Sequence, residues 1–287
     1  MEIAPIDPSE LDEARALLVA ALLWDPFVAR VAEEKLFGGN AGREGTALGA
    51  RDGGALVGIV AAAGRWVKLL AVAPDARRRG IGSALLARVE QPRLVMAAHP
   101  GNYLTPGIDP RYEAGLAFLR ARGFAQTGEV PNLRVPLVGN KRCTRAHAER
   151  IEPPVAAAGV RCRRAVAADA AALDAMVRAN FSNAQAYEIA RALEVGGVHI
   201  ALQEGAIVAF AAHDGNNRGL GWFGPAGTIE SHRGKGIGEI LLVHCMADVA
   251  ERGQDETIVA WVGPVNFYVR TIGAAIERTF IQMERPA

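Results

Sequence analysis

The sequence lacks several features that mark large classes of protein. Its three cysteines, Cys143, Cys162 and Cys245, lie far apart, so they form neither a disulfide framework nor the Cys-x-x-Cys pairs of a zinc site. No run of about 20 apolar residues could span a membrane. The net charge is only +1, whereas a nucleic-acid partner usually requires a basic stripe. We therefore expect no metal, no membrane and no nucleic-acid partner.

The first residues also lack a targeting signal. They read MEIAPIDPSELDE, without the basic start and apolar run of a signal peptide. Together with the sparse cysteines, this predicts a cytoplasmic protein in a reducing environment. The chain does contain ample apolar material, because 50% of its 287 residues are hydrophobic and 22% are charged. That length and composition predict two globular domains, each with its own core.

The first half of the chain predicts strands and helices in a recognisable order. Asp7, Pro8 and Glu10 mark a helix start, with an N-cap acceptor, a proline in the first turn and a glutamate three residues after the cap. The further elements expected from periodicity are strands at 55–63, 66–72 and 94–96, and between the last two a helix carrying Ile81, Leu85 and Val89 on one face, which Pro92 ends.

The same order returns in the second half. A spacing of 156 residues separates Gly80 from Gly236 and also Trp66 from Trp222. A period this long indicates two copies of one domain, because solenoid units are about 20–50 residues long. We therefore predict domains at 1–138 and 160–287, joined by a charged, proline-containing linker. The second copy is expected to have strands at 206–210, 222–228 and 257–262, and a helix with Ile237, Leu241, Cys245 and Val249 on one face.

Each copy carries a glycine loop between a strand and a helix. The loops are Arg77-Arg78-Arg79-Gly80-Ile81-Gly82 and Arg233-Gly234-Lys235-Gly236-Ile237-Gly238. A helix N-terminus presents unpaired N–H groups and a partial positive charge, and glycines allow an anion to approach the backbone. The pattern therefore favours a pyrophosphate site. The simpler alternatives are a tight turn that needs glycine and a solvated run of arginines.

The loops do not match the two best-known phosphate motifs. A Walker loop has Gly-Lys-Ser/Thr at the helix start, and a dinucleotide fingerprint needs a third glycine after Gly-x-Gly. The first loop is followed by Ser-Ala-Leu and the second by Glu-Ile-Leu. Neither a Walker ATPase nor a Rossmann dehydrogenase is expected.

The run Val72-x-Pro74-x-x-Arg77-Arg-Arg-Gly-Ile-Gly resembles the acetyl-CoA loop of the GNAT acetyltransferase superfamily. The pairs Phe118-Leu119 and Phe267-Tyr268, each followed by a glycine, are similar to the element that ends such a domain. The resemblance implies an α/β fold of two tandem GNAT-like domains, each a mixed, mainly antiparallel sheet flanked by helices. Two parting central strands would admit the pantetheine arm. It also implies that acetyl-CoA contacts Val72, Arg77, Arg78, Arg79, Gly80, Ile81, Gly82 and Ser83 in one copy, and Thr228, Ile229, Arg233, Gly234, Lys235, Gly236, Ile237, Gly238 and Glu239 in the other.

The resemblance assigns catalysis to the second copy. In this family the second residue of Phe-Tyr often protonates the departing thiolate, and a backbone N–H polarises the thioester carbonyl. Tyr268 fits this role as general acid, whereas Leu119 carries no proton, so we expect the first copy to be degenerate or structural. The alternatives are that Tyr268 is a core aromatic and that Tyr103 acts instead.

The base that deprotonates the acceptor is less visible. Asp214 is the chosen candidate, with His213 and Glu230 beside it. Because Asp-Gly-Asn-Asn is also a common turn sequence, a purely structural turn is the alternative, and a chain of waters is another.

Direct acetyl transfer to a primary amine of a small molecule is the expected activity. The tandem layout and the Gly-Pro dipeptides resemble bacterial glucosamine-type N-acetyltransferases, which points to an amino sugar. A non-catalytic acyl-CoA sensor or scaffold and a protein acetyltransferase stay open as alternatives, as does the oligomeric state.

Overall fold

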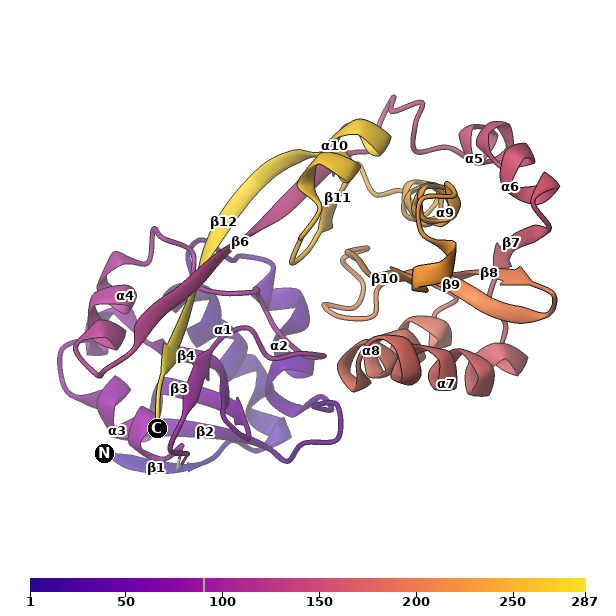
Figure 1. Cartoon of the computed structure of the whole chain (residues 1–287). Helices are drawn as coiled ribbons and strands as arrows, with labels where there is room; N and C mark the ends of the chain where they lie inside the picture. The colour runs from indigo at the N-terminus through magenta and orange to yellow at the C-terminus, as the bar shows by residue number, and fades with distance from the viewer. Residues whose placement is uncertain (90) are drawn as a thin grey trace. The chain divides into compact units, whose positions relative to one another are not determined.

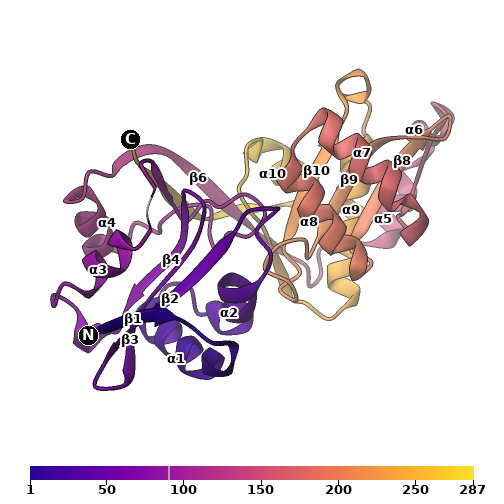
Figure 2. The same cartoon turned by 90° about the horizontal axis from the view of Figure 1, so that it is seen from below.

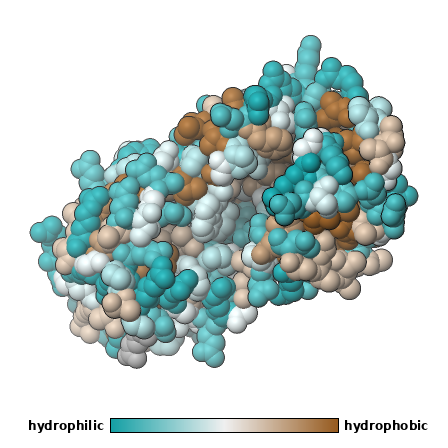
Figure 3. Space-filling model, in the orientation of Figure 1, coloured by the Kyte–Doolittle hydropathy of each residue, from teal (hydrophilic) through white to brown (hydrophobic). Residues whose placement is uncertain are grey.

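The chain divides into two compact units in a computed structural model that describes residues 1–89 and 91–287. Unit 1 comprises residues Met1–Val130 and Thr279–Ala287, and unit 2 comprises Pro131–Arg278. The last residues of the chain therefore belong to the first unit. No described helix is both long and apolar enough to cross a membrane. On the face shown in Figure 3, hydrophilic residues predominate and strongly hydrophobic residues form separate patches.

Unit 1 is a sheet with helices packed against it (Figures 1 and 2). Its strand order is β1-β2-β3-β4-β5-β12-β6, and neighbouring pairs from β1 to β4 are antiparallel while β4 and β5 are parallel. The elements are β1 (Glu2–Pro5), α1 (Leu11–Ala21), α2 (Val28–Phe37), β2 (Gly45–Asp52), β3 (Ala55–Ala63), β4 (Trp66–Val72), α3 (Ile81–Ala87), β5 (Leu94–Met96), α4 (Glu113–Arg120), and parts of β6 (Ala125–Pro136) and β12 (Ala275–Arg285).

Local sequence signals place several elements of unit 1 correctly. Strands β3, β4 and β5 have the predicted bounds, and Asp7 with Glu10 forms the predicted capping box. Helix α3 is shorter than expected, because it ends at Ala87 rather than at Pro92. The N–H groups of Arg88 and Val89 bond three residues back instead of four, so the helix tightens and stops before the proline is reached.

Unit 2 repeats this plan. Its strand order is β6-β11-β10-β9-β8-β7, antiparallel except for the parallel pair β10 and β11. The elements are α5 (Arg145–Ile151), α6 (Pro153–Ala157), β7 (Val160–Arg164), α7 (Ala170–Asn180), α8 (Asn183–Glu194), β8 (Val198–Gln203), β9 (Ala206–His213), β10 (Phe223–Thr228), α9 (Ile237–Glu251), β11 (Glu256–Val259) and α10 (Val265–Ile272). Each unit is thus the mixed, mainly antiparallel sheet flanked by helices that the sequence predicts.

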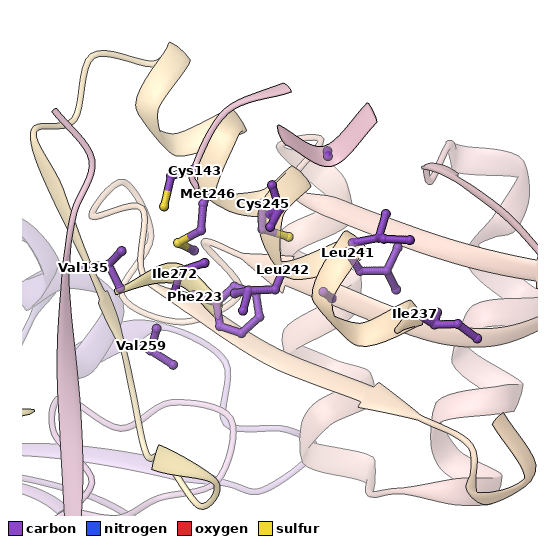
Figure 4. Close-up of a cluster of buried hydrophobic side chains, with 14 of the residues drawn as sticks. Val135, Cys143, Phe223, Ile237, Leu241, Leu242, Cys245, Met246, Val259 and Ile272 are labelled. Carbon is purple, nitrogen blue, oxygen red and sulfur yellow. The ribbon is translucent and has the colours of Figure 1, made fainter. Parts of the chain in front are cut away.

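Helix α9 forms the main core of unit 2. It lies on one side of the sheet, while α7 and α8 cover the other (Figure 1). Its predicted apolar face is buried, with Ile237, Leu241, Cys245 and Val249 at most 1% exposed. Figure 4 shows Ile237, Leu241 and Cys245 in one cluster with Phe223 of β10 and Val259 of β11. Strand β10, which precedes the glycine loop, and helix α9, which follows it, therefore pack in one core.

The segment expected to be a linker is ordered and belongs to unit 2. Residues 138–159 contain α5 and α6, and Cys143, Ala148 and Val155 are buried in the same core as the apolar residues of α9. The sequence reading fails here because both helices are too short to show an apolar period. Each unit also takes an end strand from the other half of the sequence. Residues 133–136 of β6 pair with β11 of unit 2, and residues 283–285 of β12 pair with β5 of unit 1.

Candidate active site

The two parallel strands of each unit part soon after they meet. In unit 2, β10 pairs with β11 only at Phe223 and Val259. In unit 1, β4 pairs with β5 only at Trp66–Val95 and Val67–Met96. In each unit an equivalent backbone hydrogen bond lies at the point where the two strands separate. The N–H of Ala260 donates to the carbonyl of Phe223, and the N–H of Ala97 donates to the carbonyl of Val67. Each unit therefore has the splay of two parting central strands that the resemblance implies.

A β-bulge interrupts β10 and β4 at the point where each strand separates from its parallel neighbour. On β10 the register passes from Phe223–His213 to Ala226–Ala211, and on β4 from Val67–Ala62 to Leu69–Ala61. Each strand thus has one residue more than its partner, Gly224 or Lys68 by the spacing of 156. A bulge interrupts pairing and is frequent beside active sites.

Beyond the bulge, β10 presents backbone groups to the splay. The N–H of Ile229 bonds to the carbonyl of Val208, which sets the alternation along the strand. Ala226 and Thr228 consequently direct their N–H and C=O groups away from β9 and toward the side where β11 has departed. The N–H of Ala226 can donate to an amide or thioester carbonyl, whereas the carbonyl of Thr228 already accepts from Arg233 Nε at 3.1 Å.

The two glycine loops have matching backbones. Gly80 and Gly236 have φ of 82° and 81°, a left-handed conformation that glycine adopts without strain. Arg78 and Gly234, which also correspond, have φ of 65° and 76°. Loop 1 therefore holds an arginine in a conformation for which loop 2 uses glycine.

The second loop offers a better anion site than the first. Among the described residues, no backbone acceptor bonds to the N–H groups of residues 78–82 or of residues 234–238, but α9 behind the second loop has 15 residues whereas α3 has seven. A Cβ built on Gly238 meets nothing closer than Thr228 Oγ1 at 3.7 Å. A Cβ on Gly82 meets the Phe118 ring at 3.3 Å, and Arg122 covers that ring and bonds to Ser83 Oγ. Loop 2 is therefore open where a phosphate would sit, and its residues fit acetyl-CoA.

The arginines of the loops have mixed roles. Arg77 and Arg233 each donate from Nε to the carbonyl of the last residue of the preceding strand, Val72 or Thr228. They hold the loop against the strand, a role that the sequence reading did not foresee. Arg79 pairs with Asp52, while Lys235 is exposed with no ion pair found in the described structure. Lys235 is thus the side chain best placed to add charge to a pyrophosphate site.

Tyr268 lies where the second splay begins. On helix α10, its ring contacts Phe223, the last residue of β10 paired with β11, with centroids 6.0 Å apart, and Phe267 at 5.1 Å. No hydrogen bond of its hydroxyl is found among the described residues. Burial raises the pKa of Tyr268 to about 12, so the phenol keeps its proton. Its counterpart Leu119 is a core residue, 3% exposed, and Tyr103 is a buried residue of unit 1.

Asp214 follows β9 and its carboxylate is fully engaged. Oδ1 accepts from the N–H groups of Gly219 and Gly221 at 3.0 and 2.8 Å, while Oδ2 contacts His213 and Arg252. These bonds favour the structural alternative, a turn from β9 to β10, and the catalytic role of Asp214 stays a prediction. Glu230 is exposed just before the loop.

Behind Asp214 lies a buried ionic network that sequence reasoning missed. Asp248 of α9, 3% exposed, contacts His199 at 2.9 Å and His213 at 3.4 Å, and pairs with Arg145 and Arg164. Burial opposes ionisation of Asp248, but these partners outweigh it and hold its pKa far below the ordinary range. A single aspartate in an apolar helix gives no signal of partners drawn from four other segments.

We expect Asp248→Asn to lower the free energy of unfolding of unit 2 by about 3 kcal/mol, because losing one partner leaves buried charges uncompensated. Urea denaturation at neutral pH measures this. Since the pKa of Asp248 is depressed on folding, its stabilising contribution is present above about pH 4 and is lost as the pH falls below that value. The variant should lose this part of the pH dependence.

Glu251→Gln is the matched control for that change. Glu251 lies on the same helix and also pairs with Arg145, but its side chain is 54% exposed. Exposed pairs contribute about 0–1 kcal/mol. Equal destabilisation by the two substitutions would contradict the importance of the buried network.

Comparison with known proteins decides the family. The Acetyltransferase (GNAT) domain family matches residues 43–126, and the Acetyltransferase (GNAT) family matches residues 170–273. Together these matches cover more than half of the chain. The chain belongs to the GNAT acetyltransferase family. It is a tandem GNAT protein and an acetyl-CoA-dependent N-acetyltransferase, as its two loops predict.

Solved structures share the fold of this tandem GNAT protein. A glucosamine N-acetyltransferase region of a fungal multi-domain β-N-acetylglucosaminidase has a TM-score of 0.78 at 18% identity, covering 99% of this chain and 38% of that one. An N-acetyltransferase from Sphaerobacter thermophilus has a TM-score of 0.69 at 18% identity, covering 100% and 96%. A tandem GNAT protein from the clavulanic acid pathway has 0.65 at 18% identity, covering 99% and 97%. No curated protein sequence matches the chain.

Proposed function

We propose that unit 2 transfers the acetyl group of acetyl-CoA directly to a primary amine of a small molecule, with Tyr268 as the general acid. The observation that carries this proposal is the position of Tyr268, whose ring lies against Phe223 at the start of the splay. Acetyl-CoA supplies the thioester. Its pyrophosphate would be held by residues 233–238, and its arm by the backbone of β10.

Different groups of unit 2 would assist the separate steps of acetyl transfer. The deprotonated amine attacks the thioester carbonyl, which the N–H of Ala226 polarises, and the carbon–sulfur bond breaks. The departing thiolate takes its proton from the hydroxyl of Tyr268, and a carboxylate or water accepts the proton that the amine loses. General-acid assistance of this kind is worth about 10²–10⁴-fold.

An amino sugar is the acceptor we propose to test first. The support is the fold shared with the fungal glucosamine N-acetyltransferase region, at 18% identity. The other candidate functions are a protein acetyltransferase and, from a different class, a scaffold that binds acyl-CoA without turnover. Unit 1 gives the scaffold some support, because Leu119 replaces the tyrosine and Phe118 packs under its loop.

Release of free CoA thiol separates these functions. We expect acetyl-CoA to yield thiol with glucosamine or another small primary amine, well above the rate without acceptor. A lysine-containing peptide should give little or no increase. Turnover with the peptide alone would contradict the small-molecule acceptor, and tight acetyl-CoA binding without release for any amine would favour the scaffold.

A further inference from the structure

The bulge of unit 1 carries a charged residue where unit 2 has glycine. Lys68 occupies the extra position of β4, directly after Val67, at which β4 parts from β5. Its counterpart is Gly224. Lys68 is only 3% exposed. A lysine is almost never fully buried without a partner, so its surroundings call for an explanation.

Those surroundings are a chain of buried polar side chains. Lys68 Nζ donates to Asn40 Oδ1 at 2.6 Å, and Asn40 Oδ1 lies 3.4 Å from Asn102 Nδ2. Asn102 Oδ1 in turn accepts from Lys35 Nζ at 2.9 Å, and Lys35 forms an ion pair with Glu34 at 2.8 Å. The carboxylate of Glu34 thus forms an ion pair with Lys35, while the hydrogen-bond partner of Lys68 found among the described residues is the neutral amide of Asn40.

His99 and Arg43, which lie near this series of hydrogen-bonded side chains, have buried nitrogen atoms without a hydrogen-bond partner among the described residues. His99 follows β5, is 0% exposed, and neither of its ring nitrogens has a hydrogen-bond partner in the described structure. Arg43 has a buried Nη1 in the same condition. Both lie on Trp66, with the Arg43 guanidinium 4.4 Å over the ring and the His99 ring edge-on at 5.6 Å. A buried donor left unsatisfied costs about 1–3 kcal/mol.

The charges in this cluster act on one another. Burial, together with the positive charges of Lys68, Arg43 and Lys35, lowers the pKa of His99 to about 3. Burial and Lys35 lower the pKa of Lys68 to about 7, against the opposing effect of Glu34. The positive charges of Lys68, Arg43 and Lys35 therefore act on one another here, and the polar atoms without a partner among the described residues of this cluster are Arg43 Nη1 and the two ring nitrogens of His99.

We propose that unit 1 binds the carboxylate group of a small organic acid at Lys68, Arg43 and His99. A carboxylate would bring a negative charge to Lys68 and Arg43 and could accept hydrogen bonds from all three side chains. The planar guanidinium of Arg43 matches the geometry of a carboxylate. Arg43 and Trp66 are partly exposed, so they mark the side from which a ligand would enter. The proposal is independent of acetyl transfer in unit 2.

Thermal unfolding of the full chain tests the site, with sodium propionate and sodium acetate as probes and sodium chloride at equal ionic strength as reference. We expect both carboxylates to raise the melting temperature in a saturable way. Arg43→Gln should weaken this response roughly 10- to 100-fold, the size of a lost charged hydrogen bond. Arg65→Gln is the control, because its guanidinium also lies over the Trp66 ring, at 4.5 Å, but Arg65 is exposed. Equal responses of the two variants would overturn the proposal, as would chloride acting as strongly as propionate.

Lys68→Met distinguishes a binding site from mere destabilisation. Replacing a buried cation by an apolar side chain of similar length should not lower stability without ligand, yet it should abolish the propionate response. In the wild type the response should weaken as the pH rises above about 7, because Lys68 binds the anion in its protonated form. A propionate response that persists in Lys68→Met, with the same pH dependence, would refute the role of Lys68.

Discussion

Gly238→Val should weaken acetyl-CoA binding to unit 2 by roughly 100-fold or more, because several charged hydrogen bonds to the pyrophosphate would be lost together. The fold should survive, since a Cβ at this position has only an ordinary contact with Thr228 Oγ1 at 3.7 Å. The added methyl groups would instead cover the N–H groups at the start of α9. Calorimetric titration with acetyl-CoA and steady-state turnover measure the effect.

Gly82→Val is the matched change in unit 1. Its Cβ would press on the Phe118 ring at 3.3 Å, so we expect some loss of stability but a smaller loss of kcat. Comparing the kcat values of the two variants therefore tests whether unit 2 alone carries out catalysis. If the two substitutions reduce kcat equally while the protein stays folded, the assignment of catalysis to unit 2 is wrong.

Tyr268→Phe should lower kcat by roughly 100-fold while leaving acetyl-CoA affinity nearly unchanged. General acids contribute about 10²–10⁴-fold, and a thiolate is a tolerable leaving group, so the lower end is expected. The phenylalanine ring keeps the contacts with Phe223 and Phe267, and only the hydroxyl is lost. Single-turnover acetyl transfer to the acceptor identified in the amine screen isolates the chemical step.

Tyr187→Phe is the control for this change. Tyr187 is another partly buried tyrosine of unit 2, and its ring lies near Arg191 on α8, so its hydroxyl should not affect the rate. Because the pKa of Tyr268 is about 12, wild-type kcat should show no loss from its ionisation below about pH 11. Full activity of Tyr268→Phe with chemistry rate-limiting would make Tyr268 a packing residue.

The exchange of end strands shows why sequence copies and compact units differ. The repeat places the last strand of the chain in the second copy, yet Phe280 and Met283 are 0% exposed and residues 279–287 belong to unit 1. A strand carries the information for its alternation, but its partner is chosen by long-range pairing. Nothing local in residues 275–285 distinguishes β5 from β11 as a neighbour.

The sequence by itself determined the features that depend on local chemistry. The capping box at Asp7, the strands around Trp66 and the glycine loops at Gly80 and Gly236 follow from steric and hydrogen-bonding preferences within a few residues. Those loops, with their spacing of 156, were enough to indicate two acetyl-CoA-type domains. The apolar face of α9 could be predicted for the same reason, because apolar residues at helical spacing can be recognised in the sequence.

Only the tertiary structure decided how the two similar loops differ. Phe118 under Gly82, the open space beside Gly238 and the contact of Tyr268 with Phe223 join residues far apart in sequence. The same holds for Asp248 with His199, and for Lys68 with Asn40. Burial sets the energy of each charge and hydroxyl in these groups, and burial is a property of the folded surroundings that no short stretch of sequence contains.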